Sequence, residues 1–142
     1  MLLLDRIRDP GNLGTLIRSA VGAGFDAILL YGSCVDETNL KTLRASMGTF
    51  PFIPIHSVSS VELTSLLDNH SINLVGLVCN GEEALSQITI QTPYILAVGS
   101  EANGLDLELL DQCDQCATIL IQPECESLNA AIAGSIAMFA LR

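Results

Sequence analysis

The chain has 142 residues, the length of one domain, and 49% of them are hydrophobic, which excludes a disordered or low-complexity protein. No apolar run approaches the roughly 18–20 residues of a membrane-spanning helix, and residues 1–4 lack the basic leader of a signal peptide. The net charge of −10 is uneven, because five of the six basic residues lie in residues 1–44, where they balance five acids. A polyanion would therefore meet the first third of the chain, although charge alone favours the simpler interpretation that the acidic residues keep the surface soluble.

Short apolar runs alternate along the chain with amphipathic stretches. The runs are continuous, which is typical of strands buried on both faces of a parallel sheet. We therefore expect an open parallel α/β sheet with helices on both faces. Strands are predicted at Leu2–Leu4, Ala27–Tyr31, Phe52–Ile55, Leu74–Val78, Tyr94–Val98 and Thr118–Ile121, and helices at Leu13–Ala23 (capped by Asn12), Leu40–Met47, Ser60–Asn69, Asp106–Gln112 and Ser127–Leu141.

Candidate sites follow the strands, because ligands of open α/β sheets bind at the carboxyl ends of the strands. Loops 5–14, 79–81, 99–104 and 122–127 occupy that position, and three of them are rich in Gly, Pro and Asn. The usual nucleotide motifs are missing: there is no GxxxxGK[ST], and Gly22-Ala-Gly24 follows a helix. Arg18, almost two helical turns beyond Asn12, has apolar neighbours that would hold its head near buried surface. From the residues alone it is either a site residue or a snorkelling surface arginine.

The five cysteines are an odd number in a chain with no export signal, which favours a reducing compartment and a cytoplasmic location. Cys113-Asp-Gln-Cys116 is a CxxC pair, but one pair cannot complete a four-ligand zinc site, and neither histidine has suitable spacing. We expect these thiols to pack in the interior, and we expect no metal.

Three motifs in order resemble the catalytic domain of the SpoU/TrmH-type RNA 2′-O-methyltransferases of the SPOUT superfamily. The first is DPGNLGTLIRSA (9–20), followed by KTLRASMG (41–48); the second is AVGSEANGL (97–105); the third runs from Ile119 to SLNAA (127–131). Their order and spacing agree over essentially the whole chain. The chain departs from the family in the loop of residues 120–124, where leucine, isoleucine, proline and glutamate replace the usual proline, methionine and glycine.

The resemblance implies a C-terminal deep trefoil knot, S-adenosylmethionine bound in that knot, and a homodimer to which the apolar stretch 127–141 is suited. It also implies methyl transfer to a ribose 2′-hydroxyl of tRNA or rRNA, with no metal and no membrane. The residues that match the family's cofactor site are Cys79, Gly99, Glu101, Gly104, Ile119, Ile121, Ser127 and Leu128.

The resemblance assigns the central catalytic role to Arg18. A guanidinium hardly ever deprotonates, so we expect it to stabilise the alkoxide and phosphate, with base action left open. The residues expected to orient Arg18 and the ribose are Asn12, Glu101, Ser127 and Asn129, and those expected to contact RNA phosphates are Arg6, Arg8, Lys41 and Arg44.

The resemblance makes residues 1–142 one catalytic domain, without the N-terminal substrate-binding domain that many relatives carry. The acidic charge leads us to expect that full RNA affinity needs such a domain or another protein. Two alternatives stay open. One is a catalytically silent, knotted paralogue that acts as a dimeric RNA-processing or assembly module. The other is a knotted methyltransferase that modifies a nucleobase instead of a ribose, and the Arg18 motif argues against it.

Overall fold

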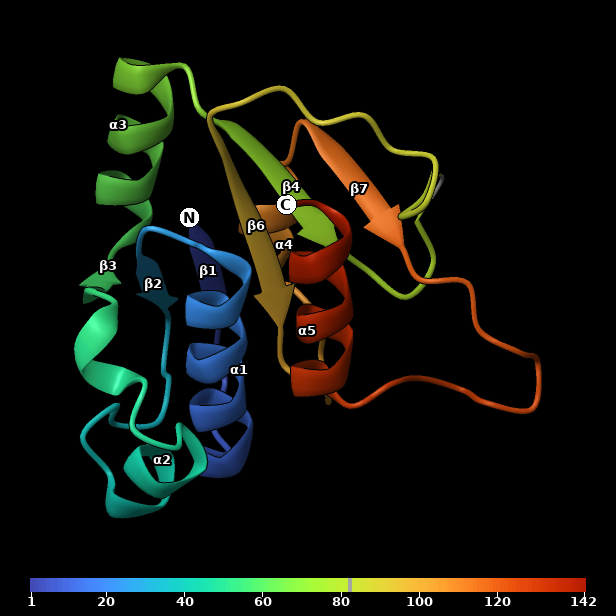
Figure 1. Cartoon of the computed structure of the whole chain (residues 1–142). Helices are drawn as coiled ribbons and strands as arrows, with labels where there is room; N and C mark the ends of the chain where they lie inside the picture. The colour runs from blue at the N-terminus through green and yellow to red at the C-terminus, as the bar shows by residue number, and fades with distance from the viewer. Residues whose placement is uncertain (82) are drawn as a thin grey trace.

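One parallel sheet organises the molecule (Figure 1). The computed structural model describes residues 1–81 and 83–142. The strand order is β3-β2-β1-β6-β4-β7-β5, and all described strand pairs are parallel. The strands are β1 (Leu2–Asp5), β2 (Ile28–Tyr31), β3 (Ile55–Val58), β4 (Asn73–Leu77), β5 (Glu83–Ala84), β6 (Tyr94–Gly99) and β7 (Gln115–Thr118). The helices are α1 (Pro10–Ala23), α2 (Leu40–Ala45), the 3₁₀ helix η1 (Phe50–Phe52), α3 (Ser60–His70), α4 (Leu107–Leu110) and α5 (Ala130–Ala140).

Helices cover both faces of the sheet, as predicted. Successive side chains of a strand point to opposite faces. Leu2 and Leu4 of β1 therefore join the core beneath α1 and α5, whereas Leu3 joins the core that contains Leu63 of α3 and Leu109 of α4. Because all five of these side chains are fully buried, the sheet has an apolar layer on each side.

Helices α1 and α5 lie side by side and run in the same direction (Figure 1). A Cβ on Gly134 would lie 2.6 Å from Leu16 Cδ2, so the glycine permits this close approach. Farther along, the hydroxyls of Ser19 and Ser135 are hydrogen-bonded at 2.7 Å. The parallel packing brings the N-terminal ends of both helices to the same edge of the sheet.

Several predicted boundaries were wrong. The expected strand Phe52–Ile55 is the end of η1 followed by β3, which begins only after Pro54, a residue without an N–H for a sheet. The cap of α1 is Asp9, not Asn12, since the Asp9 side chain accepts from the backbone N–H of Asn12 and the helix starts at Pro10.

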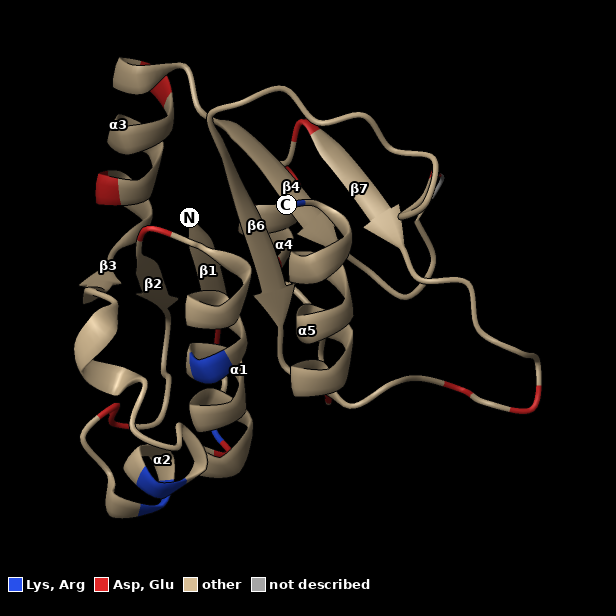
Figure 2. Cartoon of the chain, in the orientation of Figure 1, with Lys and Arg blue, Asp and Glu red and all other residues tan. Residues whose placement is uncertain are grey.

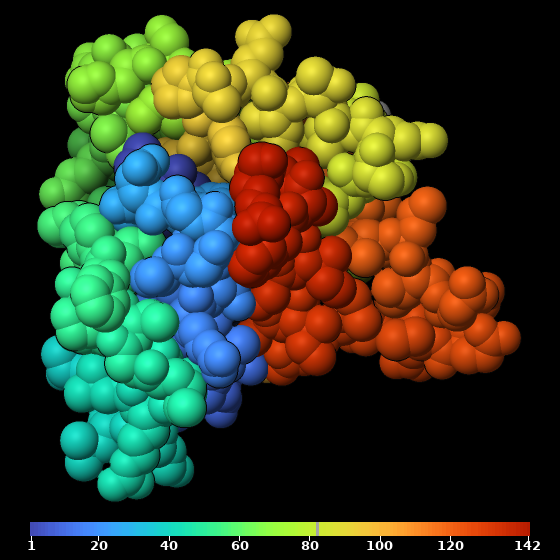
Figure 3. Space-filling model, in the orientation of Figure 1, coloured from blue at the N-terminus to red at the C-terminus, as the bar shows by residue number. Residues whose placement is uncertain are grey.

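The C-terminal third also differs from the prediction. The strand expected at Thr118–Ile121 is β7, which ends at Thr118, and α5 begins at Ala130 rather than Ser127 because Asn129 caps it. The segment between β7 and α5 (orange) projects from the body of the molecule (Figure 3). Strand β5 was not predicted. The trefoil knot stays a prediction of the resemblance, because strand order alone does not define threading.

Candidate functional site

A cavity of about 880 Å³ opens at the carboxyl ends of β4, β6 and β7. Its walls are the loops that follow these strands, the first turn of α5, Glu83 of β5, and residues 110 and 113–116, from the end of α4 to the start of β7. Of the four ligand loops predicted at this edge, 79–81 and 99–104 line this cavity, whereas loop 122–127 contributes only Ser127 and loop 5–14 does not reach it. Every residue predicted to bind the cofactor lines the cavity: Cys79, Gly99, Glu101, Gly104, Ile119, Ile121, Ser127 and Leu128.

A second cavity, of about 260 Å³, lies on the other side of loop 99–106. It is lined by residues 6–9, which lead into α1, by Asn12 in the first turn of α1, and by residues 100–103 and Ala130. Residues 100–103 border both cavities, so this loop is the wall between them. Both sides of this cavity belong to loops predicted as candidate sites, 5–14 and 99–104, but the sequence did not indicate that these two loops would form a cavity of their own.

The Glu101 carboxylate joins three distant segments beside these cavities. Its Oε1 accepts hydrogen bonds from Asn12 Nδ2 at 2.6 Å, from Asn129 Nδ2, and from the backbone N–H of Ala130 at 3.4 Å. Asn129 Nδ2 also donates to Asn12 Oδ1 at 3.0 Å. Because α1 and α5 are parallel, both present their positive N-terminal ends near this carboxylate, which stabilises its charge. Three of the five predicted catalytic residues are thus in contact.

Arg18 and Ser127 lie apart from this cluster. Arg18 is exposed and lines neither cavity, so the expectation that apolar neighbours hold its head near buried surface was wrong. Those neighbours, Leu16 among them, face the core, whereas Arg18 lies six residues beyond Asn12 and points outward. Ser127 lines the large cavity, and its carbonyl accepts from the Cys125 thiol at 3.3 Å.

The charges of the large cavity are acidic. Glu83, Glu101 and Asp114 line it, and no lysine, arginine or histidine does so among its described lining residues. An acidic lining disfavours phosphate-bearing cofactors and favours a cation. Gly99 lets residues 104–105 pack closely on the end of β6, because a Cβ on Gly99 would lie 2.2 Å from the Gly104 carbonyl carbon. The buried Ser100 hydroxyl has no described hydrogen-bond partner.

The basic residues lie mainly on the side of α1 and α2, and acidic residues colour the projecting segment before α5 (Figure 2). Arg8, Lys41 and Arg44 are exposed, as a contact with RNA phosphates requires. Arg6 differs from them, because its guanidinium pairs with Asp5 and Asp106 within the protein. The hydrogen bond with Asp5 raises the pKa of Arg6 further above its ordinary value.

The CxxC thiols pack beside β4. A Cβ on Gly76 would lie 3.0 Å from Cys113 Sγ and 3.4 Å from Cys116 Sγ. Burial, reinforced by the neighbouring Cys116, raises the pKa of the Cys113 thiol to about 12. All five cysteines are free, but Cys79 and Cys125 are exposed, so the expectation of buried thiols was wrong for these two. Over residues 1–81 and 83–142, no three His, Cys, Asp or Glu side chains gather as metal ligands would, and none of the helices described there could span a membrane.

Fold and site together define an α/β protein with an acidic ligand cavity at the carboxyl edge of a parallel sheet. The chain belongs to the SpoU rRNA Methylase family, whose model matches residues 1–139. The motif-based recognition of this family is therefore confirmed.

Similar proteins carry the names of methyltransferases. An uncharacterized tRNA/rRNA methyltransferase of Synechocystis is 35% identical over 99% of this chain and 52% of its own. The 23S rRNA (guanosine(2553)-2′-O)-methyltransferase RlmP of Bacillus subtilis is 34% identical over 100% of this chain and 57% of its own. This chain thus spans about half the length of these relatives.

Solved structures agree with the sequence relatives. The AdoMet-bound rRNA methyltransferase of Sinorhizobium meliloti matches with a TM-score of 0.91 and 35% identity, over 98% of this chain and 54% of that chain. The SpoU methyltransferase AviRb of Streptomyces viridochromogenes, in complex with AdoMet, has a TM-score of 0.92 and 28% identity, with coverages of 98% and 57%. These matches give no support to the alternative of a silent paralogue.

Proposed function

We propose that this chain is the catalytic domain of an S-adenosylmethionine-dependent RNA methyltransferase that modifies a ribose 2′-hydroxyl of rRNA or tRNA. One observation carries the proposal: Glu101 borders both cavities and is held there by Asn12 and Asn129. The large cavity would take the cofactor, and the small cavity the acceptor nucleotide. The names of the relatives and the AdoMet in two similar structures support the cofactor and the substrate class.

The large cavity fits S-adenosylmethionine in size and charge. Its volume of about 880 Å³ lies within the range of small-molecule sites. When bound, the cofactor supplies a methyl group that its sulfonium has already activated, so no metal is needed. Glu83, Glu101 and Asp114 would favour the positive charge of this ligand. The predicted set from Cys79 to Leu128 would hold it, largely through backbone groups around the glycines.

The acceptor hydroxyl must be aligned and must lose its proton during transfer. Every hydrogen bond that the described residues make to Glu101 goes to Oε1. Oε2 would therefore accept a hydrogen bond from the ribose hydroxyl. Asn12 and Asn129 would fix the carboxylate in this orientation. Ser127, at the cavity wall, would help to orient the ribose.

Arg18 would stabilise the developing alkoxide and the adjacent phosphate. It lies on the outer face of α1, so it would reach a reacting centre across an interface with a second copy of this chain. The outer face of α5 supports such a homodimer, since Ile132, Ile136 and Phe139 are 52%, 42% and 44% exposed. Gly22, one turn beyond Arg18, lies beside the Phe139 ring, so the two outer faces are continuous.

The RNA would lie along the side of α1 and α2, where Arg8, Lys41 and Arg44 are exposed. These few charges supply limited affinity in an acidic chain. The proposal therefore includes a further RNA-binding domain or a partner protein, and a cytoplasmic location where rRNA and tRNA are made.

The experiment follows transfer of a labelled methyl group from S-adenosylmethionine to rRNA fragments and tRNA, with nuclease digestion of the product. We expect the label in 2′-O-methylated nucleosides and its loss in Asn129→Ala. Asn69→Ala on α3 is the matched control and should retain activity, because Asn69 lies on the opposite side of the sheet. Label in a base, or full activity of Asn129→Ala, would contradict the proposal.

Ile136→Asp should give monomers in sedimentation, and a persistent dimer would contradict the proposed interface.

A further inference from the structure

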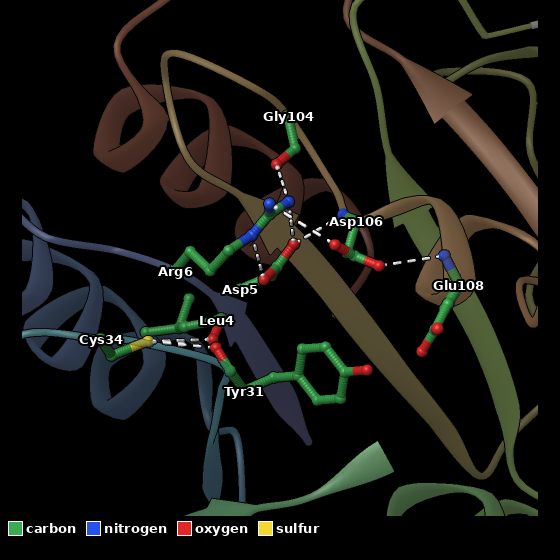
Figure 4. A network of polar contacts seen from close by, with 8 residues as sticks. All are labelled: Leu4, Asp5, Arg6, Tyr31, Cys34, Gly104, Asp106 and Glu108. Carbon is green, nitrogen blue, oxygen red and sulfur yellow. Dashed lines mark hydrogen bonds and ion pairs between the residues drawn. The ribbon is translucent and has the colours of Figure 1, made fainter.

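The loop of residues 99–106 has two anchored ends. At one end Glu101 is held by α1 and α5. Within the loop, the N–H of Gly104 donates to the Ser100 carbonyl at 2.8 Å and closes a turn. The other end, at Gly104–Asp106, is fixed by the last residue of β1 and the residue that follows it (Figure 4).

Asp5, the last residue of β1, is completely buried. Its Oδ2 accepts a hydrogen bond from the backbone N–H of Asp106 at 2.7 Å. A buried carboxylate is unfavourable unless charge and hydrogen bonds compensate it. Arg6 provides both, because its Nε donates to Asp5 Oδ1 at 2.9 Å and its Nη2 to Oδ2 at 3.0 Å. This bidentate geometry is the strong form of the arginine–carboxylate pair.

The same guanidinium also contacts the loop. Arg6 Nη2 donates to the Gly104 carbonyl at 3.4 Å, and Nη1 pairs with Asp106 Oδ2 at 3.5 Å. Figure 4 shows the Arg6 guanidinium between these groups. Only 26% of the Arg6 side chain is exposed. All three guanidinium nitrogens thus contact groups of the protein, and a phosphate would compete with these contacts for the arginine.

The backbone of Arg6 is adapted to this task. Its φ of 54° lies in the left-handed region, which is unfavourable for a residue with a side chain. The Arg6 N–H donates to the Tyr31 carbonyl at 3.0 Å, and a Cβ on Gly32 would lie 2.9 Å from Arg6 Cγ. The end of β2 thus holds the strained residue and leaves room for its side chain. Such strain persists only where the surroundings fix it.

We propose that Asp5 and Arg6 are positioning residues that set the wall between the two cavities. Arg6 also borders the small cavity, but its guanidinium is committed to this wall and not to an RNA phosphate. The inference rests on the proposed function, because that function makes loop 99–106 the wall of a cofactor site. It replaces the role that the sequence suggested for Arg6, and it leaves Arg8 as the phosphate contact of this segment.

Arg6→Gln tests the proposal, with Arg8→Gln as the matched control. We expect Arg6→Gln to weaken S-adenosylmethionine binding about tenfold and to speed hydrogen exchange at the Gly104 and Asp106 amides. The salt dependence of RNA binding should stay unchanged. Arg8→Gln should keep the cofactor affinity. In this variant the slope of the logarithm of the RNA association constant against the logarithm of the salt concentration should become smaller by about one.

The double variant Asp5→Asn/Arg6→Gln separates positioning from simple loss of stability. The Asp5→Asn change keeps an oxygen acceptor for the Asp106 amide and removes the uncompensated buried charge. Cofactor affinity should therefore recover in part relative to Arg6→Gln alone. The Leu96 amide in the centre of β6 must stay protected in Arg6→Gln, and acceleration there equal to that at Gly104 would overturn a specific role.

Unchanged cofactor affinity and loop exchange in Arg6→Gln, with a smaller salt slope, would overturn the proposal and restore Arg6 as a phosphate contact. If the wild-type protein binds no S-adenosylmethionine, the proposed function fails by itself. Hydrogen exchange then still decides whether Arg6 fixes the loop: faster exchange at Gly104 and Asp106 supports this, and unchanged exchange overturns it.

Discussion

Gly99 controls the shape of the proposed cofactor wall, and its replacement by alanine should disrupt that wall. A Cβ at this position would lie 2.2 Å from the Gly104 carbonyl carbon and 2.4 Å from both its oxygen and the Leu105 nitrogen. These are backbone atoms, so no side-chain rotation relieves the overlap. The loop must open by more than about 1 Å to restore ordinary carbon–carbon contact of about 3.5–4.0 Å.

The expected cost follows from overpacking, which is typically about 1–3 kcal/mol. S-adenosylmethionine needs the loop in its native position, so the cost of returning the displaced loop to that position would weaken cofactor binding about 5- to 150-fold. Gly104→Ala in the same loop is the matched control. A Cβ at Gly104 would meet nothing within 4 Å, but its φ of +65° is left-handed, which costs about 1–2 kcal/mol. Gly104→Asn should be milder, since asparagine adopts this conformation more readily.

Calorimetric titration with S-adenosylmethionine measures the affinities, and urea unfolding reports the stability of each variant. We expect Gly99→Ala to weaken cofactor binding most and Gly104→Asn least. Wild-type affinity in Gly99→Ala would refute the reasoning, because it would mean that the contact between residues 99 and 104–105 does not shape the site.

Three further predictions concern other parts of the chain. In urea, the free energy of unfolding of Gly14→Ala should be about 1–3 kcal/mol lower than that of Gly22→Ala. Both variants gain the same helix propensity, but only a Cβ at Gly14 would lie 2.4 Å from a backbone oxygen of α2. Equal free energies of unfolding would contradict this packing. At pH 8 iodoacetamide should modify the exposed Cys125 and spare Cys113, because a pKa of about 12 leaves roughly one Cys113 thiol in ten thousand ionised. Comparable labelling of both cysteines, measured by mass spectrometry, would contradict the burial of the Cys113 thiol. Arg18→Ala should abolish methyl transfer and leave cofactor affinity within about twofold, since Arg18 lies outside the cavity, and a large loss of cofactor binding would place it elsewhere.

The sequence predicted the centre of the sheet well because the central strands β1, β2 and β6 are buried on both faces. Leu2, Leu3 and Leu4 are all fully buried, and such continuous apolar runs distinguish a parallel sheet from a half-exposed one. The same rule was wrong for Thr118–Ile121. Ile119 and Ile121 are apolar because they line a cavity, not because they enter the sheet, and apolar composition does not distinguish these two cases.

The site was predicted only in part. The motifs identified Asn12, Glu101 and Asn129, and the parallel packing of α1 and α5 brings these three together. The outward position of Arg18 depends on which side of α1 packs against its neighbours, a tertiary property. The role of Arg6 depends on Asp106, a hundred residues away in sequence, and a local charge pattern carries no information about such a partner.

Titration of the purified chain with S-adenosylmethionine, in competition with ATP, tests the proposed function most directly. The acidic lining and the size of the large cavity predict saturable binding near one equivalent per chain, with no displacement by ATP. A folded protein that binds no S-adenosylmethionine, or that binds ATP in its place, would contradict the assignment of this cavity to the methyl donor.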